Sequence, residues 1–209
     1  MRCGPYFSRA MRAAFALVAL PIGFAISTPK RIVILGDSIT DGLGVTRAES
    51  YPTLLQSLLA QNGHPEVAII NAGVSGSTTS SGLSRLRWQL HTKPDLLILE
   101  LGANDMLRGQ PAALAQKNLA DMIALAQAAQ VKVLLTGMRV PPNYGTAYEK
   151  NFDRIYADLA ATYHVPLVPF ILEGVAGDPA LNQSDGIHPN ARGHQKIARL
   201  LLPYVLKSL

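Results

Sequence analysis

The chain has 209 residues, of which 48% are hydrophobic and 16% are charged, as in a globular protein and unlike a disordered or collagen-like one. This length suits one domain with a substantial core and is too short for two catalytic domains. Of the 19 basic residues, three lie in residues 1–27, which hold no acid, so the remainder has 16 basic against 14 acidic residues. A body so close to neutral, with no basic run, argues against a nucleic-acid partner.

Cys3 is the single cysteine of the chain. The sequence after it therefore has no disulfide, no cysteine-ligated metal site and no thiol nucleophile. This excludes a cysteine hydrolase.

Residues 1–27 have the pattern of a secretory signal peptide. Three arginines precede an apolar stretch at 13–26, and Ala25 and Ser27 have the spacing of small residues before a cleavage site at Thr28. The stretch is shorter than the roughly 20 residues of a membrane-spanning helix. We therefore expect export to the periplasm and a mature chain without stable membrane insertion. An uncleaved anchor or an upstream start codon is the alternative interpretation.

Strand and helix patterns alternate from residue 30 onward, with no linker, so residues 28–209 are expected to form one catalytic domain. In chain order, the patterns predict a strand at 31–36, a helix at 51–61, a strand at 67–70, a helix at 82–91, a strand at 95–101, a helix at 111–130, a strand at 131–135, a helix at 148–163, a strand at 165–168 and a helix at 191–206. Strands that are apolar on both faces indicate a parallel sheet covered on both sides. We predict an α/β fold, a three-layer α/β/α sandwich with a flavodoxin-like five-stranded parallel sheet.

Polar blocks interrupt the apolar pattern where the site of such a sheet lies, at the carboxyl ends of its strands. Three blocks follow the first three strands and a fourth lies near the C-terminus. They are Gly-Asp-Ser-Ile-Thr at 36–40, Asn-Ala-Gly-Val-Ser-Gly-Ser at 71–77, Gly-Ala-Asn-Asp at 102–105 and Asp-Gly-Ile-His-Pro-Asn at 185–190.

The residue types in these blocks are those that acyl transfer needs. A serine nucleophile requires an imidazole base, and the imidazole requires a carboxylate that fixes its tautomer. Ser38 leaves the first strand, and Asp185 and His188 are three residues apart on a predicted loop. The backbone amides of Ser38 and Gly76 and the side-chain amide of Asn104 are candidate donors to the oxyanion.

In this order the blocks resemble the SGNH (GDSL) hydrolase family, over residues 31–206. Glu-Leu-Gly-Ala-Asn-Asp at 100–105 and Pro-Pro-Asn-Tyr-Gly at 141–145 are most similar to its bacterial subgroup of small exported arylesterases, acyl-thioesterases and lysophospholipases. The resemblance implies the same catalytic and oxyanion roles for the five candidate residues, and no cofactor. Two positions depart from the family pattern: Ala103 replaces a common glycine, and Ser77 stands where relatives often have aspartate.

The resemblance also implies an acyl groove. Met138, Val140 and Pro142 follow the fourth strand, and Leu107 follows Asn104, so these four residues are expected to border it. An apolar rim favours aryl esters, acyl thioesters or lysophospholipids as the small-molecule substrate. A carbohydrate O-deacetylase of the same family is the alternative. We expect a monomer.

Two other classes of protein are compatible with alternating strands and helices. An α/β-hydrolase needs Gly-x-Ser-x-Gly at its nucleophile, yet Thr40 stands at the second glycine position. A non-catalytic flavodoxin-like binding module leaves the four ordered blocks unexplained. The histidines other than His188 lack the paired spacing of metal ligands, so we expect them to be structural or solvent-facing, and expect no metal.

Overall fold

The computed structural model describes residues 1, 4, 30–141 and 144–209, so the predicted signal peptide falls almost entirely outside the described residues. The predicted five-stranded parallel sheet is confirmed, with strand order β2-β1-β3-β4-β5, the order of flavodoxin-like sheets. The strands are β1 (Arg31–Gly36), β2 (Ala68–Gly73), β3 (Leu96–Leu99), β4 (Lys132–Thr136) and β5 (Leu167–Val168).

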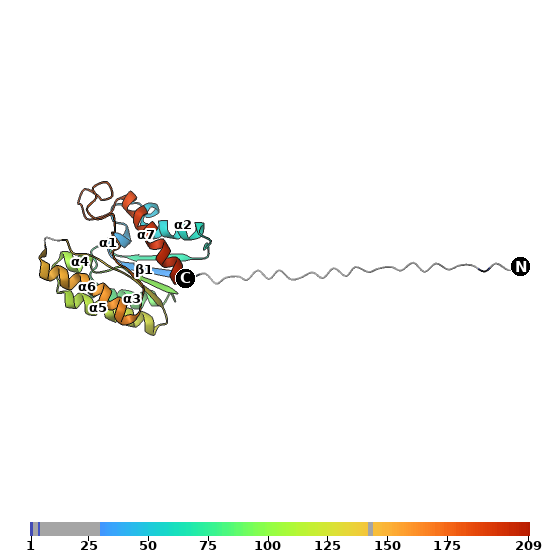
Figure 1. Cartoon of the computed structure of the whole chain (residues 1–209), viewed down its shortest axis with the longest axis horizontal. Helices are drawn as coiled ribbons and strands as arrows, with labels where there is room; N and C mark the ends of the chain where they lie inside the picture. The colour runs from blue at the N-terminus through green and yellow to red at the C-terminus, as the bar shows by residue number, and fades with distance from the viewer. Residues whose placement is uncertain (2–3, 5–29, 142–143) are drawn as a thin grey trace.

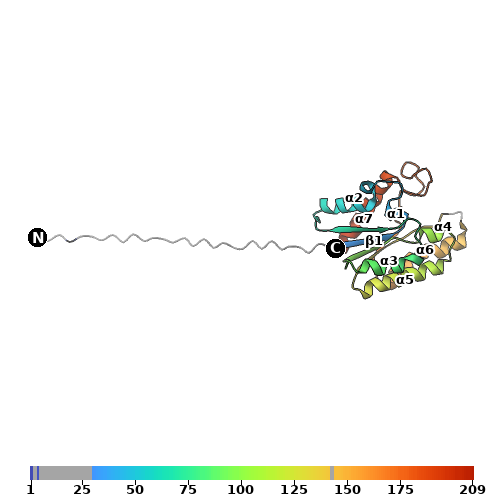
Figure 2. The same cartoon turned by 180° about the vertical axis from the view of Figure 1, so that it is seen from behind.

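Helices cover both faces of this sheet. They are α1 (Ser38–Asp41), the 3-10 helix η1 (Arg47–Glu49), α2 (Tyr51–Gln61), α3 (Thr79–Leu90), α4 (Ala103–Leu107), α5 (Ala112–Ala128), α6 (Thr146–Tyr163) and α7 (Ala191–Ser208). Figure 1 shows α2 and α7 on one side of the sheet and α3, α5 and α6 on the other, and the opposite view in Figure 2 agrees. The three-layer sandwich is therefore confirmed.

The core lies along the central strands. In β1 the residues from Ile32 to Leu35 are fully buried, and all four residues of β3 are buried too, as a strand covered by helices on both faces requires. The edge strand β2 departs from this pattern, because Ala68 and Asn71 are exposed. The expectation that every strand is apolar on both faces is wrong for β2, which has a hydrogen-bonded neighbour on one side and lies at the margin of the helical layers.

The element bounds differ from the predicted ones mainly near the polar blocks. Helix α3 begins at Thr79, three residues before its predicted start, because Asp105 accepts hydrogen bonds from the Thr79 amide at 2.8 Å and its hydroxyl at 2.7 Å. Helices α1 and α4 span four and five residues, too few to show a helical period in sequence. The fifth strand shortens to two residues.

Register brings the first three polar blocks to one edge of the sheet. Gly36 pairs with Gly73 and Leu35 with Leu99, so β1, β2 and β3 end side by side. The fourth block precedes α7, whose first turn is capped by Asn190 as expected, since its side chain accepts from two amides of that turn. Among the described residues, no helix is both long and apolar enough to cross a membrane.

Candidate active site

The first polar block forms a tight turn between β1 and α1. Ser38 is the first residue of α1 and is 8% exposed. Asp37 caps this helix, because its Oδ1 accepts a hydrogen bond from the Ile39 amide at 3.0 Å. The Ser38 hydroxyl oxygen lies 2.9 Å from His188 Nε2, so a residue 150 positions away reaches the nucleophile turn.

His188 is held by Asp185 in the orientation that a base needs. His188 Nδ1 lies 2.6 Å from Asp185 Oδ2, and Asp185 Oδ1 accepts from the amides of Ile187 at 2.9 Å and His188 at 3.0 Å. These bonds, the one to the imidazole first, lower the pKa of Asp185 to about 2. An ionised carboxylate only accepts hydrogen bonds, so Nδ1 carries the proton and Nε2 is free to accept one from Ser38.

The three oxyanion candidates come from three segments: Ser38 from α1, Gly76 from the loop after β2, and Asn104 from α4. The Ser38 and Gly76 amides donate to no other described residue, as an oxyanion site requires. The side-chain nitrogen of Asn104, on α4, lies 3.3 Å from Asp37 Oδ2. One N–H of this amide therefore faces Asp37, and the other is available for a ligand.

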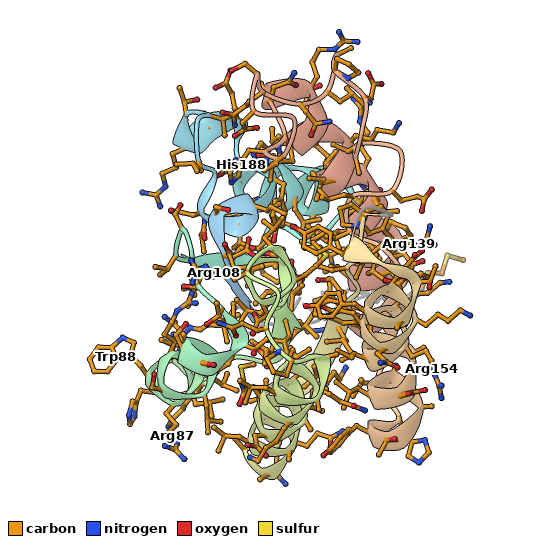
Figure 3. The ribbon with its side chains drawn as sticks, turned by 90° about the vertical axis from the view of Figure 1, so that its left-hand side faces the viewer. Arg87, Trp88, Arg108, Arg139, Arg154 and His188 are labelled. Atoms are coloured by element: carbon orange, nitrogen blue, oxygen red, sulfur yellow. The ribbon has the colours of Figure 1, made fainter. Side chains whose placement is uncertain are left out.

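The loop that carries Gly76 is tied to both neighbouring helices. Ser75 donates to Asp41 at the end of α1, from its hydroxyl at 2.6 Å and its amide at 3.2 Å. Arg108, just after α4, donates to the Gly76 carbonyl at 2.9 Å. Gly76 has a φ of +77°, a left-handed conformation that glycine adopts without strain. Figure 3 looks onto this end of the sheet, with His188 on the C-terminal segment and Arg108 on the segment after α4.

Two further carboxyl groups lie buried beneath the serine. Burial raises the pKa of Asp37 to about 6, although the Ile39 amide, His188 and Asn104 each lower it. Glu100 follows β3 and is fully buried; burial first, and the Asp37 carboxyl second, raise its pKa well above the usual range. Sequence reasoning gave neither acid a role. The available signal for Glu100 was a lone acid at the end of an apolar run.

An apolar cavity of about 440 Å³ opens beside the nucleophile and the base. Its lining is mostly aliphatic and aromatic and comprises Ile39, Ala103, Met106, Leu107, Met138, Arg139, Val140, Pro141, Phe170, Leu172, Ala176, Gly177, Gly186 and Ile187. Three of the four predicted groove residues, Leu107, Met138 and Val140, line it, and Pro142 lies outside the described residues. The one charged residue of the lining, Arg139, stacks over Phe170 with its guanidinium carbon 5.2 Å from the ring centre.

The buried histidine of α7 is structural, as expected. His194 is 1% exposed, its Nδ1 accepts from the Tyr51 amide at 3.2 Å, and burial lowers its pKa to about 4, which keeps it neutral. Within the described part of the chain, no three His, Cys, Asp or Glu side chains are grouped so as to hold a metal ion.

Comparison with known proteins supports the interpretation drawn from this geometry. Residues 34–196 match the model of the GDSL-like lipase/acylhydrolase family. The chain is 41% identical to esterase TesA of Pseudomonas aeruginosa, over 92% of this chain and 94% of TesA, and 39% identical to an arylesterase of Vibrio mimicus, over 92% and 98%. A crystal structure of TesA superimposes with a TM-score of 0.83, at 41% identity, over 86% of this chain and 100% of TesA.

Proposed function

Since the chain belongs to the GDSL-like lipase/acylhydrolase family and is a carboxylic ester hydrolase, we propose that it acts through an acyl-enzyme on Ser38. The observation that carries this proposal is the 2.9 Å contact between Ser38 Oγ and His188 Nε2 beside an apolar cavity. His188 is in turn oriented by Asp185 at 2.6 Å, so nucleophile, base and carboxylate form one continuous chain.

The steps follow from this arrangement. Ser38 Oγ attacks the ester carbonyl carbon while His188 Nε2 takes the hydroxyl proton, and Asp185 stabilises the imidazolium. The amides of Ser38 and Gly76 and the Asn104 side chain hold the oxyanion. As the intermediate collapses, His188 gives the proton to the leaving alcohol oxygen. Water, deprotonated by His188, then attacks the acyl-serine carbonyl. As this second intermediate collapses, His188 returns the proton to Ser38 Oγ, and the carboxylic acid leaves.

The proposed substrates have an apolar acyl or aryl group: aryl and acyl esters, and also acyl thioesters and lysophospholipids. The cavity supports this choice, because its 440 Å³ far exceed the space that an acetyl group fills and its lining offers Arg139 alone as a charged group. A carbohydrate O-deacetylase would need polar side chains to bind a sugar, so this alternative is the weaker one. The cavity walls do not distinguish between ester and thioester, since the two differ at the scissile atom and not in the acyl chain.

We also propose that the enzyme acts outside the cytoplasm. The three arginines, the apolar stretch and the small residues before Thr28 support a signal peptide at residues 1–27, with residues 28–209 as the mature, monomeric catalytic domain in the periplasm. Mass spectrometry of the protein from its native host is expected to begin within a few residues of Thr28. An intact Met1 in the cytoplasmic fraction would contradict export.

A fluorophosphonate probe tests the reaction itself. We expect it to label one serine, Ser38, identified by peptide mass. Ser38→Ala should not be labelled, and His188→Ala should be labelled much more slowly than the wild type. A panel of p-nitrophenyl esters from acetyl to long acyl chains then ranks substrates. The proposed groove predicts that kcat/KM rises with chain length until the cavity is filled; a maximum at acetyl would favour the deacetylase alternative.

A further inference from the structure

Glu100 is a buried acid that the proposed reaction does not use. It lies at the carboxyl end of the central strand β3, is 0% exposed, and forms no ion pair with any Lys or Arg among the described residues. Its Oε1 has no hydrogen-bond partner in the described structure. Burying a carboxyl group costs free energy unless hydrogen bonds compensate for the lost water. The hydrogen bonds that Glu100 does form therefore indicate its role.

Those contacts all lead to the nucleophile turn. Oε2 accepts from the Thr40 hydroxyl at 2.6 Å and from the Asp37 amide at 3.2 Å, which are the residues on either side of Ser38 and Ile39. The Thr40 oxygen lies 2.6 Å from the Tyr51 hydroxyl, and because the Thr40 hydrogen points to Glu100, Tyr51 is the donor in this second bond. One carboxyl oxygen thus connects the turn to β3 and, through Thr40, to α2.

We propose that Glu100 is a positioning residue for the nucleophile: it fixes the turn that aims the Ser38 hydroxyl at His188 and the Ser38 amide at the oxyanion. The inference rests on the proposed function, since it assumes that Ser38 attacks the substrate. Gly36 supports it, because a Cβ there would collide with both Thr40 Oγ1 and Glu100 Oε2. The strand therefore needs glycine at this position to let the carboxyl group approach the turn.

The protonation state of Glu100 follows from its surroundings. The groups that face it are Thr40 and Asp37 of the turn, Tyr51 of α2 and Arg85 of α3. Tyr156 of α6 is close enough for a charge on Glu100 to raise the pKa of the tyrosine hydroxyl. Arg85 lowers the pKa of Glu100, but its effect is smaller than those of burial and of Asp37, which raise it. Arg85 instead donates to the carbonyls of Gly36 and Ala72. Burial and the Asp37 carboxyl thus both favour the protonated form of Glu100, and a neutral amide of the same shape is expected to replace it.

The experiment compares Glu100→Gln with Glu100→Leu, measuring kcat, KM and the second-order rate of Ser38 labelling by a fluorophosphonate. The glutamine oxygen keeps both acceptor bonds, so Glu100→Gln is expected to stay within about twofold of wild type in all three. Glu100→Leu removes them, and because a displaced reactive group costs up to roughly 10²-fold, we expect kcat and the labelling rate to fall roughly 10- to 100-fold with KM little changed.

Thr40→Val covers the case in which Glu100→Leu does not fold. It removes the hydroxyl that links Tyr51 to Glu100 and is expected to slow labelling several-fold. The matched control is Thr136→Val, a fully buried threonine of β4 whose hydroxyl donates to the Leu99 carbonyl, which is expected to lower thermal stability without slowing the labelling of folded protein.

The outcomes separate the two proposals. Equal labelling of wild type and folded Glu100→Leu, or equal loss in Thr40→Val and Thr136→Val, overturns the positioning role while leaving Ser38 as nucleophile. Loss in Glu100→Gln as large as in Glu100→Leu overturns the neutral, hydrogen-bonding role. Absence of Ser38 labelling in the wild type overturns the proposed function instead.

Discussion

The two halves of the candidate site use carboxyl groups in opposite ways. Around the nucleophile, Asp37 and Glu100 are fully buried and their pKa values are raised, mainly by burial. Around the base, the Asp185 side chain is 43% exposed and its pKa is lowered to about 2 by three hydrogen bonds. Desolvation dominates in the first region and hydrogen bonding in the second.

This difference matches what each half has to do. The nucleophile turn must keep its shape as charge forms and disappears on the substrate, so it is built into the end of the sheet, where burial disfavours the charged form of both acids. The base must become charged during the reaction, and an ionised Asp185 on an accessible loop stabilises that charge without bearing the cost of a buried carboxylate. Rigidity thus comes from the strand ends and charge from the loop.

Ser38→Ala is expected to have the largest effect. Removing the hydroxyl leaves no nucleophile, so ester hydrolysis should fall by on the order of 10⁴-fold or more while the thermal transition is unchanged. Adding His188→Ala to it should cost little more, because members of a triad act as a unit. Ser84→Ala, an exposed serine of α3, is the matched control. Near-full activity in purified Ser38→Ala would show that Ser38 is not the nucleophile, and the nucleophile half would have no catalytic role.

Asp185→Asn tests whether the base half depends on charge. The asparagine oxygen keeps the bonds from the Ile187 and His188 amides, but its NH₂ group facing Nδ1 favours the tautomer in which Nε2 carries the proton. We expect kcat to fall by up to about 10⁴-fold, the loss known for such a tautomer change. Asp178→Asn, in the preceding loop, controls for local effects. A folded Asp185→Asn within tenfold of wild type would show that the negative charge is dispensable.

Asn104→Ala tests whether this side chain, which contacts Asp37 in the nucleophile half, is an oxyanion donor. An amide aimed at the oxyanion binds more strongly as the carbonyl oxygen gains charge, so kcat should fall about 10²–10³-fold with little change in KM. If Asn104 serves only to contact Asp37, thermal stability falls instead and kcat survives. Asn118→Ala, which removes an amide bonded to Thr79 and Ser80, is the control for lost amide contacts.

Sequence reasoning reached the fold and the candidate residues because both depend on local signals. Apolar runs of four to seven residues predicted the strands. The Gly-Asp-Ser, Gly-x-Asn-Asp and Asp-x-x-His blocks were recognisable as polar interruptions of the apolar pattern. The contacts that support the site depend on tertiary structure. The bonds from Thr40 and Asp37 to Glu100, and from Arg108 to Gly76, join residues 32 to 63 positions apart, and no local pattern announces them.

The smallest expected effect is a difference in how stability depends on pH. The pKa of Asp37 is raised to about 6 in the folded protein, so its stability contribution is fully retained below the ordinary value of 3.8 and declines as pH rises toward 6. The pKa of Asp185 is lowered to about 2, so its contribution is present above 3.8 and is lost as pH falls toward 2. The two acids therefore favour the folded state in opposite pH ranges.

Thermal unfolding of wild type, Asp37→Asn and Asp185→Asn from pH 3 to pH 7 measures this difference. Asp37→Asn also loses its hydrogen bond from Asn104, which shifts its melting temperature at every pH. The quantity to compare is therefore the slope of stability against pH. Between pH 4 and pH 6 the wild type should lose stability relative to Asp37→Asn, by at most roughly 3 kcal/mol for a shift of about two pKa units. Below pH 4 the wild type should lose stability relative to Asp185→Asn, by less, because solvent screens the exposed carboxylate. Parallel curves for the wild type and Asp37→Asn between pH 4 and pH 6 would mean that Asp37 is ionised at little cost, and that desolvation does not set the chemistry of the nucleophile turn.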